Sequence, residues 1–325
     1  MKRREFIAGT VGMGTLGPDF TNHKKSKFPA LRFGICSDIH QDIYFDVPER
    51  LKAFVDEMIQ KKVDFIIQLG DFCRPEPKNQ VIVDIWNNFP GQKLHVIGNH
   101  DPENRFPREE VVRFWGAIDR YYSIDVKGFH LVILDGNDKN PNPARKGQLS
   151  YERYVSEEQL EWLRDDLDKT SAPVIIFLHQ SLDMDNGVEN AAHVRAVLER
   201  CNQKAGYQKV QAVFSGHHHL DYYNRINGIH YIQINSMSYH WQGDTYAESP
   251  FKDELNQKYP NLKRMNHYKD PLWAYIEISE NGNLKMLGQK SQFVGKSPKD
   301  LGMPEYHKVH PVVPFISDRN IKLNF

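Results

Sequence analysis

The chain has 325 residues, enough for one large domain or two modest ones with a well-buried core. Lysine plus arginine and aspartate plus glutamate each total 42, so the formal net charge is zero and no global field attracts a nucleic-acid polymer or an anionic membrane. The 3 cysteines form no CxxC pair, which argues against a disulfide framework or a thiolate zinc site.

Residues 1–30 read as an export signal followed by a linker. The start MKRREFIAGTVGMGTLG places Arg3 and Arg4 before a short, glycine-rich, weakly apolar stretch, and it resembles a bacterial twin-arginine signal. The stretch is too short to cross a bilayer as a helix, so no transmembrane span is expected. We therefore expect export to the periplasm; the alternative is a disordered basic N-terminus on a cytoplasmic protein.

From Leu31 onward, short β-rich apolar runs alternate with helical patterns. Each apolar run ends in a polar, turn-prone cluster, as in LRFGICSD, VDFIIQLGD, KLHVIGNHD, PVIIFLHQ and VQAVFSGH. Helices are predicted over PERLKAFVDEMIQKK, SEEQLEWLRDDLDK and NAAHVRAVLERCNQK, the second opening with a Ser156 to Gln159 capping box.

Three later stretches predict β-hairpins, and two of them carry Lys-Gly or Asn-Gly turns: YYSIDVKGFHLVILD, YYNRINGIHYIQIN and WAYIEISENGNLKML. Alternating strands and helices followed by hairpins indicate an α/β layered core with mixed sheets, in one domain over residues 31–290. Within it, residues 239–270 are polar and aromatic without clear periodicity, which predicts a long ordered loop or insertion. Residues 291–325 are expected to form an irregular tail.

The polar clusters at the strand ends share one set of residue types. In chain order they present Asp38 and His40, Asp71, Asn99 with His100 and Asp101, His179, and His217 with His219. Ligands collect at the carboxyl ends of strands in open α/β sheets. Aspartate, asparagine and imidazole without thiolates suit two divalent or trivalent ions such as Mn, Fe, Zn or Ni.

Spacing within the clusters suggests how the ligands are shared. Asp71 is the natural bridge, because one carboxylate can join two ions about 3.5–4 Å apart. Residues two apart in an extended segment point the same way, so Asp38 with His40, and His217 with His219, should each act as a pair while His218 points elsewhere. A single cluster could equally be turn chemistry or a core histidine. All of them together, each after an apolar strand, favour one site.

The ordered set D-x-H, G-D, G-N-H-D, H and G-H-x-H over residues 31–235 resembles the calcineurin-like metallophosphoesterase superfamily. The resemblance implies a four-layer α/β/β/α sandwich with a dinuclear centre on its loops. It implies one metal held by Asp38, His40, Asp71 and His219, and the other by Asp71, Asn99, His179 and His217. The sequence departs from many members at GDFCR, where Arg74 occupies the place of a further aspartate that is not a ligand.

The implied chemistry is hydrolysis of a phosphoric ester by a hydroxide shared between the two ions. His100 is the family's candidate donor of a proton to the leaving group. Asp101 either orients that imidazole and raises its pKa or caps the turn. Arg105 and Arg74 are candidate partners of phosphate oxygens. Tyr239 and His240, with Trp241, are candidates for a wall that stacks on a base or sugar.

The substrate is expected to be a small phosphate ester. The compact pattern resembles the bacterial branch containing cyclic-nucleotide and nucleotide-diphosphate hydrolases, which favours a phosphodiesterase or diphosphate-linked nucleotide hydrolase. A phosphomonoesterase of acid or alkaline phosphatase type is the alternative, and a non-catalytic scaffold is the third. The oligomeric state is open.

Overall fold

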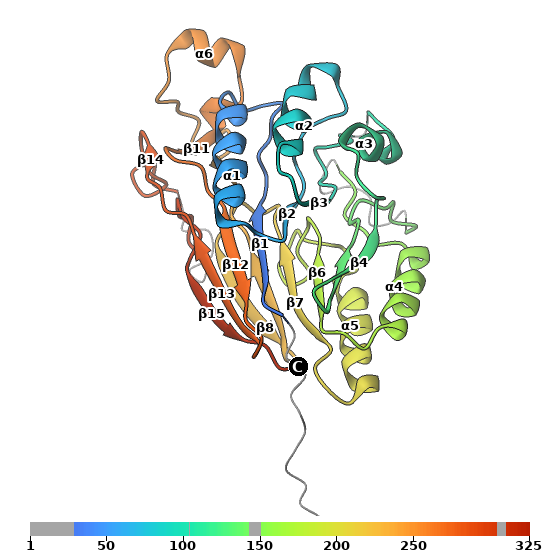
Figure 1. Cartoon of the computed structure of the whole chain (residues 1–325). Helices are drawn as coiled ribbons and strands as arrows, with labels where there is room; N and C mark the ends of the chain where they lie inside the picture. The colour runs from blue at the N-terminus through green and yellow to red at the C-terminus, as the bar shows by residue number, and fades with distance from the viewer. Residues whose placement is uncertain (1–28, 104, 143–150, 304–309) are drawn as a thin grey trace, which may run out of the picture.

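The computed structural model describes residues 29–103, 105–142, 151–303 and 310–325. Within them, two 6-stranded mixed sheets lie face to face, and helices cover the outer face of each sheet (Figure 1). The predicted α/β/β/α sandwich is therefore confirmed. The export signal proposed for the N-terminus lies outside the described residues except at its last positions.

The first sheet has the strand order β15-β13-β12-β1-β2-β3. Its strand β1 pairs in parallel with β2 and antiparallel with β12, which makes the sheet mixed. The strands are β1 Leu31–Cys36, β2 Phe65–Gln68, β3 Gln92–His95, β12 Ala274–Ile278, β13 Asn283–Gly288 and β15 Arg319–Lys322. Its outer face packs on α1 Val47–Lys61, α2 Gln80–Asn87 and α3 Arg108–Trp115.

The second sheet has the strand order β4-β5-β6-β7-β9-β8. The neighbours β5, β6, β7 and β9 run parallel, with an antiparallel strand at each edge. The strands are β4 Tyr122–Val126, β5 Phe129–Ile133, β6 Val174–Phe177, β7 Val210–Ser215, β8 Tyr222–Ile226 and β9 Ile229–Gln233. Its outer face packs on α4 Glu157–Lys169 and α5 Ala191–Ala205.

Aromatic side chains join the inner faces of the two sheets. Phe33 of β1 stacks on Phe65 of β2 with ring centroids 4.8 Å apart. The same ring meets Phe177 and Phe214 of the second sheet edge-on, each at 5.9 Å. These contacts pack the inner faces of the two sheets against each other, so the loops that follow β1, β2, β6 and β7 have a rigid base.

The predicted hairpins are present as β4/β5, β8/β9 and β12/β13. In the first two, both turn residues have positive φ: 49° at Lys127 and 82° at Gly128, then 48° at Asn227 and 87° at Gly228. This is the turn whose twist matches paired strands. At the start of α4, Ser156 Oγ accepts the Gln159 N–H at 3.4 Å, while the Gln159 side-chain amide donates to the carbonyl of Asp135, so only half of the capping box forms.

Two segments are more regular than the sequence pattern indicates. Residues 239–270, expected to be a long ordered loop or an insertion, hold α6 Asp253–Lys258 and the strands β10 Tyr239–Trp241 and β11 Met265–Tyr268; β11 pairs with β10 and with β14 Phe293–Val294. Strand β11 is buried on both faces, so it lacks the alternation that marks a half-exposed strand. The tail expected to be irregular adds β15 to the edge of the first sheet, with only Ile321 pointing inward.

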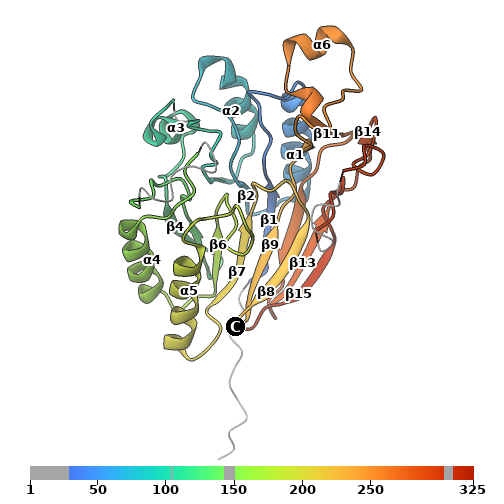
Figure 2. The same ribbon diagram turned by 180° about the vertical axis from the view of Figure 1, so that it is seen from behind.

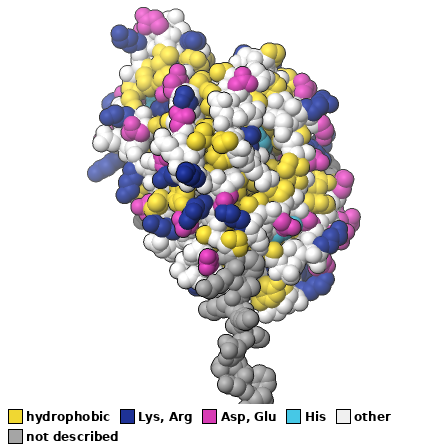
Figure 3. All heavy atoms as spheres, viewed as in Figure 1, with side chains coloured by type: hydrophobic (Ala, Val, Ile, Leu, Met, Phe, Trp, Pro, Cys, Tyr) yellow, Lys and Arg dark blue, Asp and Glu magenta, His cyan; other side chains and the backbone are white. Residues whose placement is uncertain are grey.

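The small β10-β11-β14 sheet and α6 lie at one end of the sandwich, and the C-terminus lies at the other (Figures 1 and 2). On the face drawn in Figure 3, basic and acidic side chains are interspersed rather than gathered into one field. Among the described residues, no helix is long and apolar enough to cross a membrane.

Candidate dinuclear metal centre

The polar strand ends from both sheets meet at one edge of the sandwich, where their loops are bonded to one another. Asp38 N–H donates to the carbonyl of Gly70 at 3.1 Å, and His40 N–H donates to the carbonyl of Asp71 at 2.9 Å. In the second sheet, Gly216 N–H donates to the carbonyl of His179 at 2.9 Å. The backbone thus holds the loops together independently of any ligand that the side chains bind.

Five of the seven predicted ligand side chains come from left-handed backbone, not from extended segments. The φ angles are 52° at Asp38, 53° at His40, 52° at Asp71, 76° at His217 and 52° at His219. Asp38 and His40 do belong to one ligand group, as expected. The reason given for it, an extended segment, is wrong. Left-handed backbone costs a non-glycine residue about 1–2 kcal/mol, and such strain clusters at functional sites.

Two motif glycines allow the carboxylates to approach. A Cβ added to Gly98 would lie 2.2 Å from Asp71 Oδ1, and one added to Gly216 would lie 2.7 Å from Asp38 Oδ2. Both distances are shorter than any tolerated contact, so side chains at these two positions would displace the carboxylates. Gly98 of GNHD and Gly216 of GHHH therefore leave the space that the carboxylates of Asp71 and Asp38 occupy.

The first ligand group consists of Asp38, His40 and His219, with one potential ligand atom from each residue and all three atoms within 4.8 Å of one another. The Nε2 atoms of His40 and His219 lie 3.1 Å apart, and Asp38 Oδ1 lies 3.3 Å from His219 Nε2. His219 Nδ1 donates to the carbonyl of Tyr239 at 2.8 Å. That bond places the ring proton on Nδ1 and leaves Nε2 for a metal.

The second ligand group consists of Asp71, His179 and His217, again within 4.8 Å. His179 Nδ1 donates to the carbonyl of Leu69 at 2.7 Å, so its Nε2 faces the group, where it lies 3.3 Å from His217 Nδ1. Asn99 Oδ1 lies 3.1 Å from His179 Nε2. The structure therefore brings the predicted amide ligand to this group and divides His217 and His219 between the two groups.

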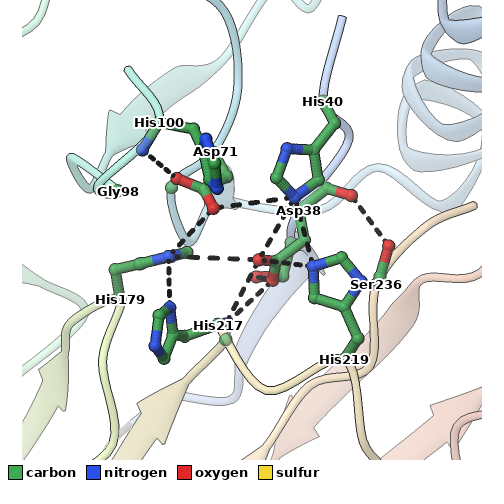
Figure 4. Close-up of polar contacts among 12 residues, drawn as sticks. Asp38, His40, Asp71, Gly98, His100, His179, His217, His219 and Ser236 are labelled. Carbon is green, nitrogen blue, oxygen red and sulfur yellow. Dashed lines mark hydrogen bonds and ion pairs between the residues drawn. The ribbon is translucent and has the colours of Figure 1, made fainter. Parts of the chain in front are cut away.

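Asp71 lies between the two groups, as Figure 4 shows. Its Oδ2 is 3.6 Å from His40 Nε2 of the first group and 3.3 Å from His179 Nε2 of the second. Its Oδ1 accepts the His100 N–H at 2.8 Å, which fixes the carboxylate in this orientation. The geometry suits the bridging role that the sequence suggests for Asp71.

Burial and charge together set the protonation of these groups. Burial alone would raise the pKa of the Asp38 and Asp71 carboxyls, but the neighbouring histidines outweigh it and hold both pKa values below the ordinary range. Burial lowers the pKa of His40 to about 3. Burial also lowers the pKa of His179, yet the charges of Asp71 and Asp38 prevail and raise it to about 9.

The donor set fits a pair of metal ions. His219 and His179 each carry the ring proton on Nδ1, so their Nε2 lone pairs lie 3.3 Å from Asp38 Oδ1 and Asp71 Oδ2, which are acceptors too. A cation between them and the two carboxylates satisfies every lone pair. Nitrogen and oxygen donors without sulfur are compatible with Mn, Fe, Zn or Ni.

Asp101 and His100 have different surroundings. The Asp101 carboxylate accepts the backbone N–H groups of Gly98 at 2.7 Å, Asp71 at 3.0 Å and Phe72 at 2.7 Å. This is the turn-capping alternative, and the carboxylate facing the His100 imidazole is instead that of Glu103, with Oε1 3.6 Å from Nδ1. His100 lines the cavity beside the second group.

The two candidate arginines are not equivalent. Arg74 lines a small hollow beside His40, Asp71 and His100, and its guanidinium pairs with Glu103. The Arg105 side chain is 61% exposed, and its ion pair is with Glu76 at 3.9 Å. The structure therefore does not bring Arg105 to the ligand groups.

A cavity of about 300 Å³ opens above the ligand groups. Among the described residues it is lined by Asp71, Asn99, His100, Tyr151, Asn186, His217, His218, His219, His240 and Trp241. Tyr239, expected in the wall, is instead fully buried beneath it, with its ring 5.4 Å from His40 and 4.9 Å from His219. It serves the site through its carbonyl, whereas His240 does reach the cavity.

Tyr151, His218 and Asn186 also line the cavity, and the sequence pattern predicts no role there for any of them. Tyr151 Oη lies 3.2 Å from His217 Nε2, His218 Nε2 lies 2.8 Å from Ser181 Oγ, and Asn186 has a φ of 61°. Neither Tyr151 nor Asn186 follows an apolar strand, so the strand-end pattern carries no signal for them. For His218 the expectation that it points away from the ligand groups agrees with its bond to Ser181.

Fold and site together define a dinuclear metallophosphoesterase. The family profile of the calcineurin-like phosphoesterases matches residues 31–221, so the chain belongs to this family. It is a metal-dependent hydrolase of phosphoester bonds.

Two relatives are bacterial proteins named as phosphodiesterases. A probable cyclic nucleotide phosphodiesterase of Fibrobacter succinogenes is 24% identical, over 59% of this chain and 73% of its own. A 3′,5′-cyclic-nucleotide phosphodiesterase of Nostoc is 26% identical, over 67% of this chain and 77% of its own.

Solved structures share the fold at low identity. A dimetal phosphatase from Danio rerio superposes with a TM-score of 0.57 at 17% identity, covering 83% of this chain and 100% of its own. GAP50, the anchor in the inner membrane complex of Plasmodium, superposes with a TM-score of 0.53 at 15% identity, covering 91% of this chain and 89% of its own. Because an anchor protein shares the architecture, the fold alone does not establish catalysis.

Proposed function

We propose that the protein is a phosphodiesterase acting on small nucleotide-type esters or on diphosphate-linked nucleotides. The observation that carries the proposal is the cavity, which joins the second ligand group and His100 to an aromatic wall. Trp241 and Tyr151 offer ring surfaces on which a base or sugar can stack. The names of the two bacterial relatives point to the same substrate class.

The charge of the cavity favours a diester over a monoester. Among the described residues that line it, none is a lysine or an arginine. A phosphodiester carries one negative charge and a monoester about two near neutral pH, so the monoester needs more positive charge from the protein. Arg74, which lines the hollow beside His40 and Asp71, is already paired with Glu103.

The chain's own residues have separable roles in this reaction. Two ions bound by the ligand groups would supply a hydroxide nucleophile at neutral pH and neutralise charge on the phosphoryl oxygens. As the bond between phosphorus and the leaving oxygen breaks, the electron pair departs with that oxygen, and His100 gives it a proton. Asp101 holds the loops that carry Asp71 and His100 in place through its three amide bonds.

The test compares bis(p-nitrophenyl) phosphate with p-nitrophenyl phosphate on the metal-loaded protein, followed by 3′,5′-cyclic nucleotides and dinucleotide diphosphates. We expect a higher kcat/KM for the diester. A marked preference for the monoester would establish the phosphomonoesterase alternative, towards which the relative named serine/threonine-protein phosphatase CPPED1 from Danio rerio points.

We also propose that the chain is exported through its twin-arginine-like start, MKRREFIAGT. Fractionation of a bacterial host, with Arg3 and Arg4 changed to lysine in a matched strain, tests this. Retention of the variant in the cytoplasm with the parent in the periplasm is the expected result.

A further inference from the structure

Glu103 lies next to His100 without belonging to either ligand group. Its Oε1 is 3.6 Å from His100 Nδ1, and its other carboxylate oxygen pairs with the guanidinium of Arg74. The side chains of His100 and Glu103 are 37% and 36% exposed, and that of Arg74 is 13% exposed. The three therefore form a chain from the partly buried guanidinium to the imidazole at the edge of the cavity.

The backbone around Glu103 is held in an unfavourable conformation. Its φ is 40°, in the left-handed region where a residue other than glycine is strained. Two residues earlier, Asp101 is fixed by its three amide bonds, and the next turn is closed by Arg105 N–H donating to the carbonyl of Pro102 at 2.8 Å. This framework presents the carboxylate to His100, and strain of this kind at a cavity indicates a functional constraint.

The backbone of Arg74 is also held by hydrogen bonds. Its N–H donates to Asp42 Oδ2 at 2.8 Å, and its carbonyl accepts from Asn79 Nδ2 at 3.0 Å. These bonds fix the backbone of Arg74, and its guanidinium pairs with one oxygen of Glu103 while the other oxygen faces the imidazole. Arg74, at which GDFCR departs from many family members, thus contacts Glu103, which in turn lies beside His100.

We infer that Glu103 is a positioning residue for His100: it accepts the Nδ1–H of the imidazole, with Arg74 holding its carboxylate, and so leaves Nε2 to protonate the leaving group. The inference rests on the proposed function of His100 as the proton donor. The 3.6 Å separation is longer than a hydrogen bond of about 2.7–3.2 Å, and catalytic hydrogen bonds in ligand-free enzymes often shorten only when substrate binds.

The first test uses Glu103→Gln with a series of phosphodiesters whose leaving groups run from p-nitrophenol to simple alcohols. A proton donor matters little for p-nitrophenolate and greatly for an alkoxide. We expect kcat to stay within about twofold on the nitrophenyl ester and to fall about 10–100-fold on the alkyl ester, the usual range for loss of an orienting partner. A uniform loss across the series would overturn the inference.

A double-variant cycle identifies the residue through which Glu103 acts. If it acts through His100, His100→Ala with Glu103→Gln should be no slower than His100→Ala alone. Additive losses would contradict this. Glu76→Gln is the matched control, because Glu76 is a partly exposed glutamate that pairs with Lys78 at 2.6 Å, with Arg105 as its other neighbour. It should behave as the parent.

A spectroscopic measurement separates this inference from the proposed function. The measurement uses zinc-loaded protein labelled with ¹⁵N-histidine, and the His100 signals are assigned by their absence in His100→Ala. In the parent and in Glu76→Gln these signals should show a proton on Nδ1. In Glu103→Gln that proton should be lost from Nδ1 or shared between the two ring nitrogens. If the parent hydrolyses no phosphodiester, the proposed function fails while this measurement still decides the role of Glu103. Identical His100 signals in parent and Glu103→Gln would overturn that role.

Discussion

The two ligand groups have the same kinds of donor atom but different access to solvent. In the first, Asp38 is 0%, His40 4% and His219 1% exposed, and the ring of Tyr239 covers both histidines. In the second, Asp71 is 3% and His179 0% exposed, but His217 is only half-buried, and Asp71, Asn99 and His217 all line the 300 Å³ cavity, to which the first group contributes His219 alone. The first group is thus built to retain an ion, and the second to hold an ion that substrate can approach.

The largest expected effect comes from the residue that belongs to both groups. Asp71→Asn removes the bridging charge but keeps an oxygen that can accept the His100 N–H, so the fold should survive. We expect kcat/KM to fall about 10³-fold, because several kcal/mol of charge stabilisation are lost and each 1.4 kcal/mol or so is a factor of ten. Elemental analysis should show fewer than two metal ions per chain.

The matched control is Asp56→Asn, since Asp56 lies on the surface of α1 and pairs with Lys52. It should keep the parent's metal content and rate. Two fully occupied ions in Asp71→Asn would show that the carboxylate does not bridge.

Metal removal tests the difference in access directly. During a slow titration with EDTA, the ion of the exposed second group should leave before that of the buried first group. Activity would then be lost while about one ion per chain remains, and Mn²⁺ or Zn²⁺ should restore it. Parallel measurement of metal content and turnover decides the point, and simultaneous loss of both ions in proportion to activity would contradict the comparison.

Tyr151 gives a smaller effect confined to the second group. Its hydroxyl lies 3.2 Å from His217 Nε2, on the side of the ring opposite the ligand atom Nδ1. Tyr151→Phe removes this orienting bond, and we expect about tenfold weaker metal binding in the second group, within the range for such partners, with the first group unchanged. Competition with a chromophoric chelator measures both affinities.

The control for that variant is Tyr207→Phe, which removes a hydroxyl that donates to the carbonyl of Ser171 at 3.0 Å, just after the C-terminal end of α5. Equal weakening of both groups in Tyr151→Phe would mean that the tyrosine supports the whole edge of the sandwich and not His217.

The same comparison shows what the sequence can predict. Residues such as Asp38 and His217 follow long apolar strands, and parallel strands deliver their carboxyl ends to one edge, so their convergence is predictable from pattern alone. The backbone that aims them is not, because left-handed φ at Asp71 or His219 depends on loops packed across two sheets. Tyr151 and Glu103 stand at no fixed spacing from a strand, so only the fold reveals them.

The sequence predicts strands least well where burial of both faces removes the alternation of polar and apolar residues. The β11 segment has no polar face, and the tail strand β15 is too short to show alternation. Both are fixed by what they pack against: β11 by β10 and β14, and β15 by the edge of β13.

The smallest predicted effect concerns His130, which belongs to neither ligand group, and it changes the free energy of unfolding. His130 of β5 places Nδ1 2.7 Å from Asp125 and Nε2 2.8 Å from Asp166. Burial lowers the pKa of His130, but the bonds to Asp166 and Asp125 outweigh it and raise the pKa above its ordinary value.

The folded state therefore binds the His130 proton more tightly than the unfolded chain does. The resulting stabilisation is complete below the unfolded pKa of about 6.5 and is lost as pH rises through the folded pKa. In metal-saturated protein, His130→Asn should lower the free energy of unfolding by about 1 kcal/mol more at acidic than at alkaline pH. Urea unfolding at several pH values gives both curves, and a constant difference between parent and His130→Asn would show that His130 contributes packing without its charge.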